Sequence, residues 1–147
     1  RARGPRGLAC RAIELSGATP EPLRTMLGNR VYGEDGCRLV CPWAKFAQAA
    51  AGADFDVRHG VDGATLVELF AWDAEAFDTR MQGSAIRRIG YESWLRNLAV
   101  GLGNALRADA GRLTPQARDA IVAALRARAD DPSPVVREHV EWALRAA

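Results

Sequence analysis

The sequence has 147 residues, of which 48% are hydrophobic and 26% are charged, as in one ordinary globular domain or two small helical ones. No apolar run approaches the ~20 residues of a membrane-spanning helix, and residues 1–15 lack the apolar stretch of a secretory signal. These features predict a cytoplasmic chain with no membrane partner.

The net charge of +2 hides a segregation, because basic blocks at residues 1–48 and 79–108 flank an acidic block at residues 49–78.

Nearly all of the basic residues are arginines, with Lys45 as the exception. The guanidinium group presents a fixed fork of donors that suits phosphate, so an anionic polymer is a candidate partner. A codon bias toward Arg and Ala is the alternative explanation of the same excess.

The first segment, residues 1–48, is punctuated by glycine and proline. Thr19 followed by Pro20 is typical of an N-cap with proline at the first helical position, which predicts a helix over residues 20–27 that stops at Gly28. The chain from there to Pro42 has no helical period, so Cys37 and Cys41 are expected on irregular backbone.

The cysteines form the most specific motif of the sequence. Cys37 and Cys41 precede Pro42 in a C-x3-C-P pattern, which is the end of the bacterial ferredoxin run C-x2-C-x2-C-x3-C-P. Two alternatives remain open at this point. The cysteines could be small buried apolar groups, or they could form a zinc site with Cys10 and His59.

Residues 49–63 are small, acidic and rich in glycine, and are predicted to be a linker. The region after it, residues 64–147, is predicted to be a helical domain. Its apolar positions recur at helical spacing, and capping residues precede three of the apolar runs. The expected helices carry Leu66, Leu69 and Phe70; then Phe77 and Met81 after the cap Asp73; then a stripe of Tyr91, Leu95, Leu98, Leu102, Ala105 and Leu106; and two last helices after Thr114-Pro115 and Ser133-Pro134.

A faint internal repeat adds to the prediction for the second half. The pairs Leu95-Arg96 and Val136-Arg137 begin similar stretches 41 residues apart, a spacing that fits paired-helix HEAT-type repeats of ~40–47 residues. The predicted fold class is therefore mainly α, with an irregular cysteine segment followed by HEAT-like helical repeats.

Three stretches of the sequence resemble the epoxyqueuosine reductases, which are cobalamin-dependent iron-sulfur enzymes of tRNA queuosine biosynthesis. Residues 28–46 (GNRVYGEDGCRLVCPWAKF) resemble that family's second cluster motif, and residues 83–104 and 130–144 resemble its C-terminal helical, HEAT-like region. A further stretch, IELSG at residues 13–17, also resembles the family, so the resemblance runs over about residues 13–146. It implies that residues 1–48 are the C-terminal part of an iron-sulfur, ferredoxin-like module.

The resemblance also implies cofactors and partners. Cys37 would be a ligand of one 4Fe-4S cluster, Cys41 a ligand of the other, and Cys10 a third metal ligand of this chain. The cobalamin-binding domain and the catalytic residues would lie upstream of Arg1, so no catalytic residue is assigned here and the chain alone is not expected to be active. The expected partners are the anticodon arm of a tRNA and an electron donor protein or reductant, with the chain acting as a monomer.

Two departures from the family pattern leave a second function open. Glu34 stands where the family has a cysteine, and Cys10 lies three residues after the position of the family's upstream cysteine, which falls on Gly7. The alternative is therefore a cluster-free helical module that binds RNA or protein and has no catalytic activity.

The predicted RNA-binding residues are four arginines of the second basic block, Arg80, Arg87, Arg88 and Arg96. Arginine forks on phosphates would give a salt-dependent affinity, while unstacked bases would carry the sequence information. The competing hypothesis is a solvated helix face whose arginines pair with the acidic block. Trp94 and Trp142 are expected in the core, and His59 and His139 are expected to be structural or solvated.

Overall fold

The computed structural model describes residues 12–33, 41–48, 52, 59–108 and 111–147. Every regular element within these residues is a helix, which confirms the prediction of a mainly α chain. In the same part of the chain, no helix has both the length and the apolar character needed to cross a bilayer.

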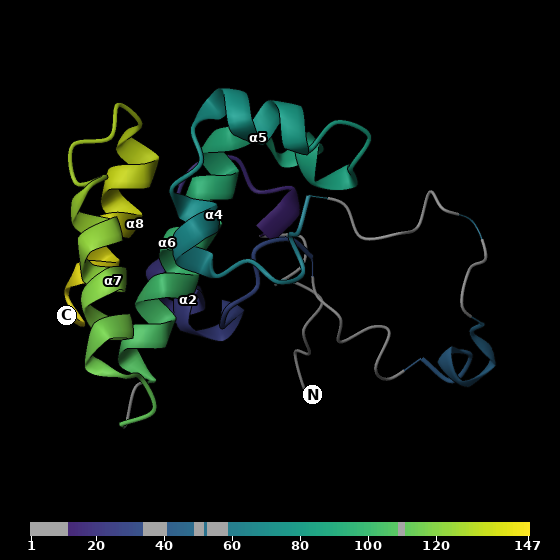
Figure 1. Ribbon diagram of the computed structural model, residues 1–147, viewed down its shortest axis with the longest axis horizontal. Coiled ribbons are helices and arrows are strands. Elements are labelled where there is room, and N and C mark those ends of the chain that lie inside the picture. Colours follow the sequence, from purple (N-terminus) through teal and green to yellow (C-terminus); the bar gives the residue numbers. More distant parts are fainter. Residues whose placement is uncertain (1–11, 34–40, 49–51, 53–58, 109–110) are drawn as a thin grey trace.

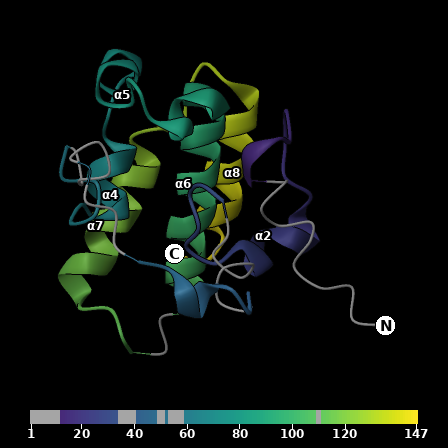
Figure 2. The same ribbon diagram turned by 90° about the vertical axis from the view of Figure 1, so that its right-hand side faces the viewer.

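The central element is α6 (Gly90–Arg107), the longest helix described. Figure 1 shows it in the middle of the helical body, and Figure 2 shows α4 (Leu66–Phe70) and α7 (Pro115–Arg126) on one side of it and α8 (Pro134–Leu144) and α2 (Glu21–Leu27) on the other. Its residues 94–103 are all buried, because neighbours cover it on nearly every side. The leucines of the predicted stripe lie inside this core, as do Trp94 and Trp142.

The helix starts follow from capping chemistry. The side chains of Asp73, Thr114 and Ser133 each accept a hydrogen bond from the backbone N–H three residues further on, at the starts of α5 (Ala74–Arg80), α7 and α8. Each such bond satisfies one of the N–H groups that the first helical turn leaves without a partner. The caps predicted from the sequence at these three positions are confirmed.

The start of α2 differs by one residue from the prediction. The N-cap is Pro20, with no side-chain cap, and the helix covers Glu21–Leu27. Thr19 is fully buried, and its backbone N–H donates to Nε2 of His139 at 3.1 Å instead. This bond joins the beginning of α2 to the middle of α8.

Glycine allows α6 and α8 to approach closely. A Cβ at Gly103 would lie 2.7 Å from the Trp142 ring and 2.9 Å from the Cα of Ala143. The second of these neighbours is backbone, which cannot rotate away, so the two helices could not keep this separation with a larger residue.

Three polar side chains of α6, Arg96, Asn97 and Asn104, hold the N-terminal segment, and we call them the α6 clamp. Arg96 donates to the carbonyls of Leu15 and Gly17 at 2.6 and 2.8 Å. The Asn97 amide donates to the carbonyls of Ala12 and Val31, both at 2.8 Å, and Asn104 donates to those of Arg24 and Gly28. Residues 12–33 are therefore packed onto the helical body, although the sequence assigned them to the first segment.

Candidate cluster-ligand and RNA-contact residues

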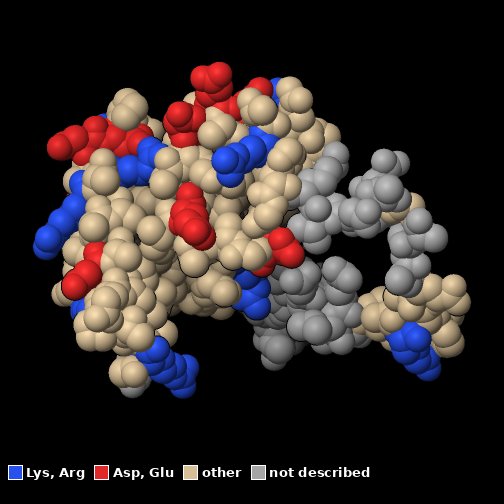
Figure 3. All heavy atoms as spheres, in the orientation of Figure 1, with Lys and Arg blue, Asp and Glu red and all other residues tan. Residues whose placement is uncertain are grey.

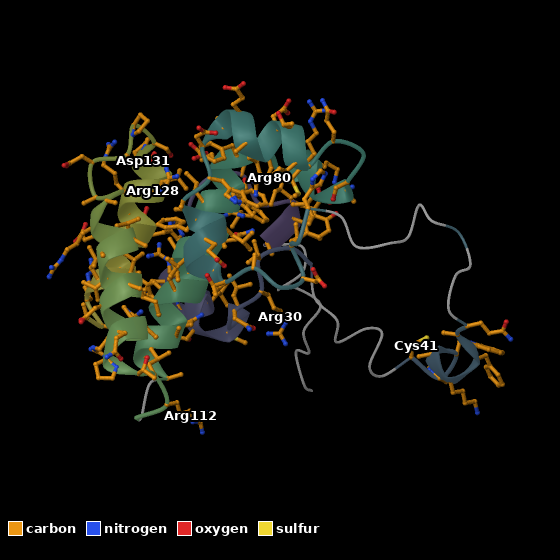
Figure 4. All side chains as sticks on the ribbon, in the orientation of Figure 1. Arg30, Cys41, Arg80, Arg112, Arg128 and Asp131 are labelled. Atoms are coloured by element: carbon orange, nitrogen blue, oxygen red, sulfur yellow. The ribbon has the colours of Figure 1, made fainter. Side chains whose placement is uncertain are left out.

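Cys41 is the candidate cluster ligand that the structure describes. It is half-buried and free, and it begins a turn in which its carbonyl accepts from the N–H of Ala44, the first residue of the 3-10 helix Ala44–Phe46. Figure 4 shows Cys41 at one end of the molecule, away from the helices. The turn also exposes two aromatic side chains, Trp43 and Phe46, whose ring centroids are 5.7 Å apart.

The other predicted metal ligands, Cys10 and Cys37, lie outside the described residues, as does Glu34. Within the part of the chain that is described, no three His, Cys, Asp or Glu side chains are grouped so that they could hold a metal ion. The free thiol of Cys41 fits one position of an iron-sulfur site, because a thiolate is the usual protein ligand of such clusters. The ligand set as a whole stays a prediction.

Arg87 and Arg88 lie on the surface, in the 3-10 helix Ala85–Ile89, and each is paired with a carboxylate. Arg87 makes two hydrogen bonds to Asp78, at 2.7 and 2.8 Å, and Arg88 makes one to Glu14 at 2.7 Å. Pairing with the acidic block is therefore present at Arg87. Since all four side chains are exposed, these ion pairs are weak and a phosphate can compete for both arginines.

The expectation that Arg96 contacts RNA is corrected by the structure. Its side chain is 0% exposed, and its guanidinium donates to backbone carbonyls of the N-terminal segment. Burial lowers the pKa of this group from its ordinary value, while the charge of Glu92 acts in the opposite direction. Arg96 is thus a structural residue of the α6 clamp and lies outside any phosphate-binding surface.

Arg80 ends α5 and lies on the surface with its guanidinium stacked on Trp72, 4.6 Å from the centre of the ring. Trp72 also packs against Trp94, with ring centroids 5.8 Å apart and an angle of 21° between the planes. Arg80 is therefore held in place by an aromatic stack that continues into the core.

The two histidines differ in their surroundings. His59 is exposed in a turn and has a positive φ of 61°, which is uncommon for a residue with a side chain. His139 is fully buried and bonded on both ring nitrogens, to the N–H of Thr19 and the carbonyl of Val135. The structural role expected of His139 agrees with this geometry.

Arg128 lies just after α7 and joins α4, α6 and the segment between α4 and α5, a role that the sequence did not predict. Its guanidinium donates to the carbonyls of Phe70 and Trp72 at 2.9 and 2.7 Å, and to the Tyr91 hydroxyl at 3.0 Å. It also pairs with Asp131 in the turn before α8, and Figure 4 shows these two residues side by side. The available signal was the helical spacing of Ile121, Leu125 and Arg128, which places Arg128 on the apolar face of the helix predicted after Thr114-Pro115.

Comparison with known proteins gives a consistent result over most of the chain. No protein-family profile matches the sequence. The chain is 77% identical over 137 residues to an epoxyqueuosine reductase of Burkholderia pseudomallei, and 52% identical over 133 residues to that of Pseudomonas aeruginosa. These matches cover 92% and 90% of this chain and 34% of each relative, so the chain spans about a third of the length of the curated relatives it matches.

Solved structures show the same fold. An epoxyqueuosine reductase crystallised with an epoxyqueuosine-modified tRNA-Tyr stem loop superimposes with a TM-score of 0.63 at 18% identity, over 95% of this chain and 43% of that one. The enzyme from Bacillus subtilis gives a TM-score of 0.60, also at 18% identity and with the same coverage.

Proposed function

Since this chain is related to the C-terminal portion of the epoxyqueuosine reductases, we propose that it serves the same reaction, the reduction of epoxyqueuosine to queuosine in tRNA. The observation that carries the proposal is the 77% identity over 137 residues. The proposed contribution of this chain has two parts, namely thiolate ligands for 4Fe-4S clusters and a helical surface for the anticodon arm of the tRNA. Cobalamin would be bound by the rest of such an enzyme, and an external reductant would supply electrons.

The proposed cluster ligands are Cys37 and Cys41, one for each of two clusters, with Cys10 as a further ligand. When bound, such clusters supply single electrons at a potential that the surrounding protein tunes. The half-exposed thiol of Cys41 supports this role, because a ligand must be reachable by iron and must lose its proton when it binds.

Anaerobic reconstitution tests the cluster proposal. We expect the intact protein, supplied with iron, sulfide and the upstream part of the enzyme, to develop the broad visible absorption of iron-sulfur clusters. Cys41→Ser should lower the iron content by about half, since serine keeps the shape and removes the thiolate of one of two separately ligated clusters.

Met26→Leu is the control for this experiment, because it removes the sulfur of an exposed residue that has no thiol. A wild-type protein that stays colourless would contradict the electron-transfer role and leave the cluster-free helical module as the function. An equal iron content in wild type and Cys41→Ser would remove Cys41 from the ligand set.

The proposed RNA surface consists of Arg80, Arg87 and Arg88. Each is exposed, and the carboxylate partners of Arg87 and Arg88 are exposed as well. A phosphate can replace such a carboxylate at little cost, because exposed ion pairs contribute only ~0–1 kcal/mol.

We expect Arg87→Ala combined with Arg88→Ala to weaken binding of an anticodon stem loop and to make its salt dependence shallower. For each phosphate that no longer binds an arginine, the slope of log K against log[salt] should fall by about 0.7–0.9. Fluorescence anisotropy at several salt concentrations measures both quantities. An unchanged slope would assign these arginines to a solvated face that only pairs with carboxylates.

A further inference from the structure

A cavity lies between the turn at residues 59–64, the helix α4 and the end of α5. Its volume is about 410 Å³, which is within the range of small-ligand sites, and it opens to solvent. The residues that decide its chemistry are His59, Ala64, Glu68, Trp72 and Arg80. Figure 4 shows Arg80 next to α5, and Figure 3 shows basic and acidic side chains side by side on the face of the molecule that is turned to the viewer.

Packing and hydrogen bonds hold the wall of this cavity in place next to Arg80. Trp72 is only 9% exposed and packs against both Trp94 and the Arg80 guanidinium. The Trp72 carbonyl accepts from the Tyr91 hydroxyl at 2.6 Å and from Arg128 at 2.7 Å, so the backbone is fixed as well. A guanidinium held on such a platform is ordered before any ligand arrives, which lowers the entropic cost of binding.

The guanidinium of Arg80 also has N–H donors that no described residue uses. Within residues 12–33, 41–48, 59–108 and 111–147, no hydrogen bond or ion pair engages its guanidinium, whereas Arg87 and Arg88 both pair with carboxylates. Because Arg80 is also exposed, the described part of the chain leaves its N–H groups available to a ligand in the cavity.

Glu68 gives the cavity a second kind of polar group. Its Oε2 accepts from the backbone N–H and the hydroxyl of Thr65 in the capping box of α4. These bonds hold the carboxylate in place and lower its pKa, so it is ionised and acts only as an acceptor at neutral pH.

We propose that this cavity receives a single unstacked nucleobase of the bound RNA, with Arg80 stacking on the base and Glu68 accepting from one of its N–H groups. The inference rests on the proposed function, because it assumes that RNA is the partner. Bases outside a duplex are recognised by stacking on arginine or aromatic planes and by hydrogen bonds to their edges. The His59 imidazole lines the same cavity and offers a second flat surface.

The combination of charges favours a base over a phosphate alone. A phosphate placed in the cavity would meet the Glu68 carboxylate as well as Arg80, and the two anions would repel each other. A base is neutral, so it can stack on the guanidinium while one of its N–H groups donates to the carboxylate. Trp72 supports the guanidinium from the side opposite to the base, and Ala64 adds apolar surface to the cavity.

Binding of fluorescent anticodon stem loops to the intact protein tests the proposal. We expect Arg80→Ala to raise Kd at least about fivefold, as for the loss of one stacked base. Arg80→Lys should also weaken binding, because lysine keeps the charge but has no plane. Arg112→Ala is the matched control, since Arg112 is an exposed arginine that does not line the cavity (Figure 4), and it should change Kd less than about twofold.

Loops in which one nucleotide at a time is abasic identify the base that binds. One abasic position should weaken wild-type binding by the same factor as Arg80→Ala, and the two changes together should cost no more than either alone. The proposal is overturned if Arg80→Ala behaves like Arg112→Ala, or if Arg80→Ala weakens every abasic loop equally, as removal of a phosphate-binding group would. If the wild-type protein binds no stem loop at all, the proposed function fails rather than this site.

Discussion

Replacement of Arg96 by alanine is expected to lower the free energy of unfolding by about 3–5 kcal/mol, which is a large share of the total stability of a domain. Arg96 is completely buried, and its charged donors bond the carbonyls of Leu15 and Gly17. Hydrogen bonds to a charged group contribute ~1.5–3 kcal/mol each. Truncation to alanine also leaves a cavity beside α6, and this adds to the destabilisation.

Urea unfolding followed by circular dichroism measures this change in stability. Arg88→Ala is the control, because it removes an arginine of the same basic block that pairs with the exposed Glu14, and we expect a change of less than about 1 kcal/mol. Similar destabilisation in the two variants would mean that the α6 clamp does not stabilise the fold. Arg96→Lys should recover part of the stability, since a lysine can still donate to one carbonyl.

Acidification from pH 7 to pH 4 is expected to remove up to about 3 kcal/mol of stability through His139 alone. Burial is the main cause that lowers the pKa of this residue from 6.5 to about 4, and the nearby Arg24 and Arg96 act in the same direction, against the Val135 carbonyl and Glu138. The protonated ring would lose the hydrogen bond that its Nε2 accepts from Thr19. The neutral ring is therefore the form that belongs to the folded state.

The sign of this effect follows from proton uptake. Between pH 6.5 and about 4 the unfolded chain binds the proton on His139 and the folded chain does not. The contribution of neutral His139 to the free energy of unfolding is therefore complete above pH 6.5 and is lost as the pH falls toward 4. The size corresponds to ~1.4 kcal/mol for each unit of pKa difference. Below pH 4 both states are protonated and no further destabilisation arises from this residue.

His139→Gln isolates the contribution of His139 to the pH dependence of stability, because glutamine can accept the hydrogen bond from the N–H of Thr19 but does not titrate in this range. We expect the variant to be less stable than wild type at pH 7 and to lose less stability than wild type between pH 7 and pH 4. Parallel pH profiles of unfolding free energy for the two proteins would show that His139 is not the titrating group.

Local chemistry made the helices after residue 64 predictable from the sequence. Asp73, Thr114 and Ser133 are caps whose side chains bond within three residues, so no tertiary information is needed to recognise them. The start of α2 was less predictable, because the bond that fixes it is not local. Thr19 has a distant partner, His139, and this long-range bond outweighs the local capping preference.

The role of Arg96 could not be predicted from charge alone. A basic residue on a helix is usually exposed, and only burial of α6 on nearly all sides places this one inside. Gly101 and Gly103 were the signal in the sequence, since glycines within a helical pattern mark close approach of neighbouring elements. In the structure Gly101 meets Leu66 of α4, and Gly103 meets Trp142 and Ala143 of α8.

The α6 clamp makes the N-terminal segment and the helices thermodynamically dependent on each other. Asn97 bonds Ala12 and Val31 with one amide group, so a shift of either part of the chain disturbs the other through α6. Any ligand whose affinity depends on that folded segment would therefore raise the melting temperature of the helical body. By reciprocity, a substitution that loosens the helices would weaken binding of the same ligand, even from the far side of α6.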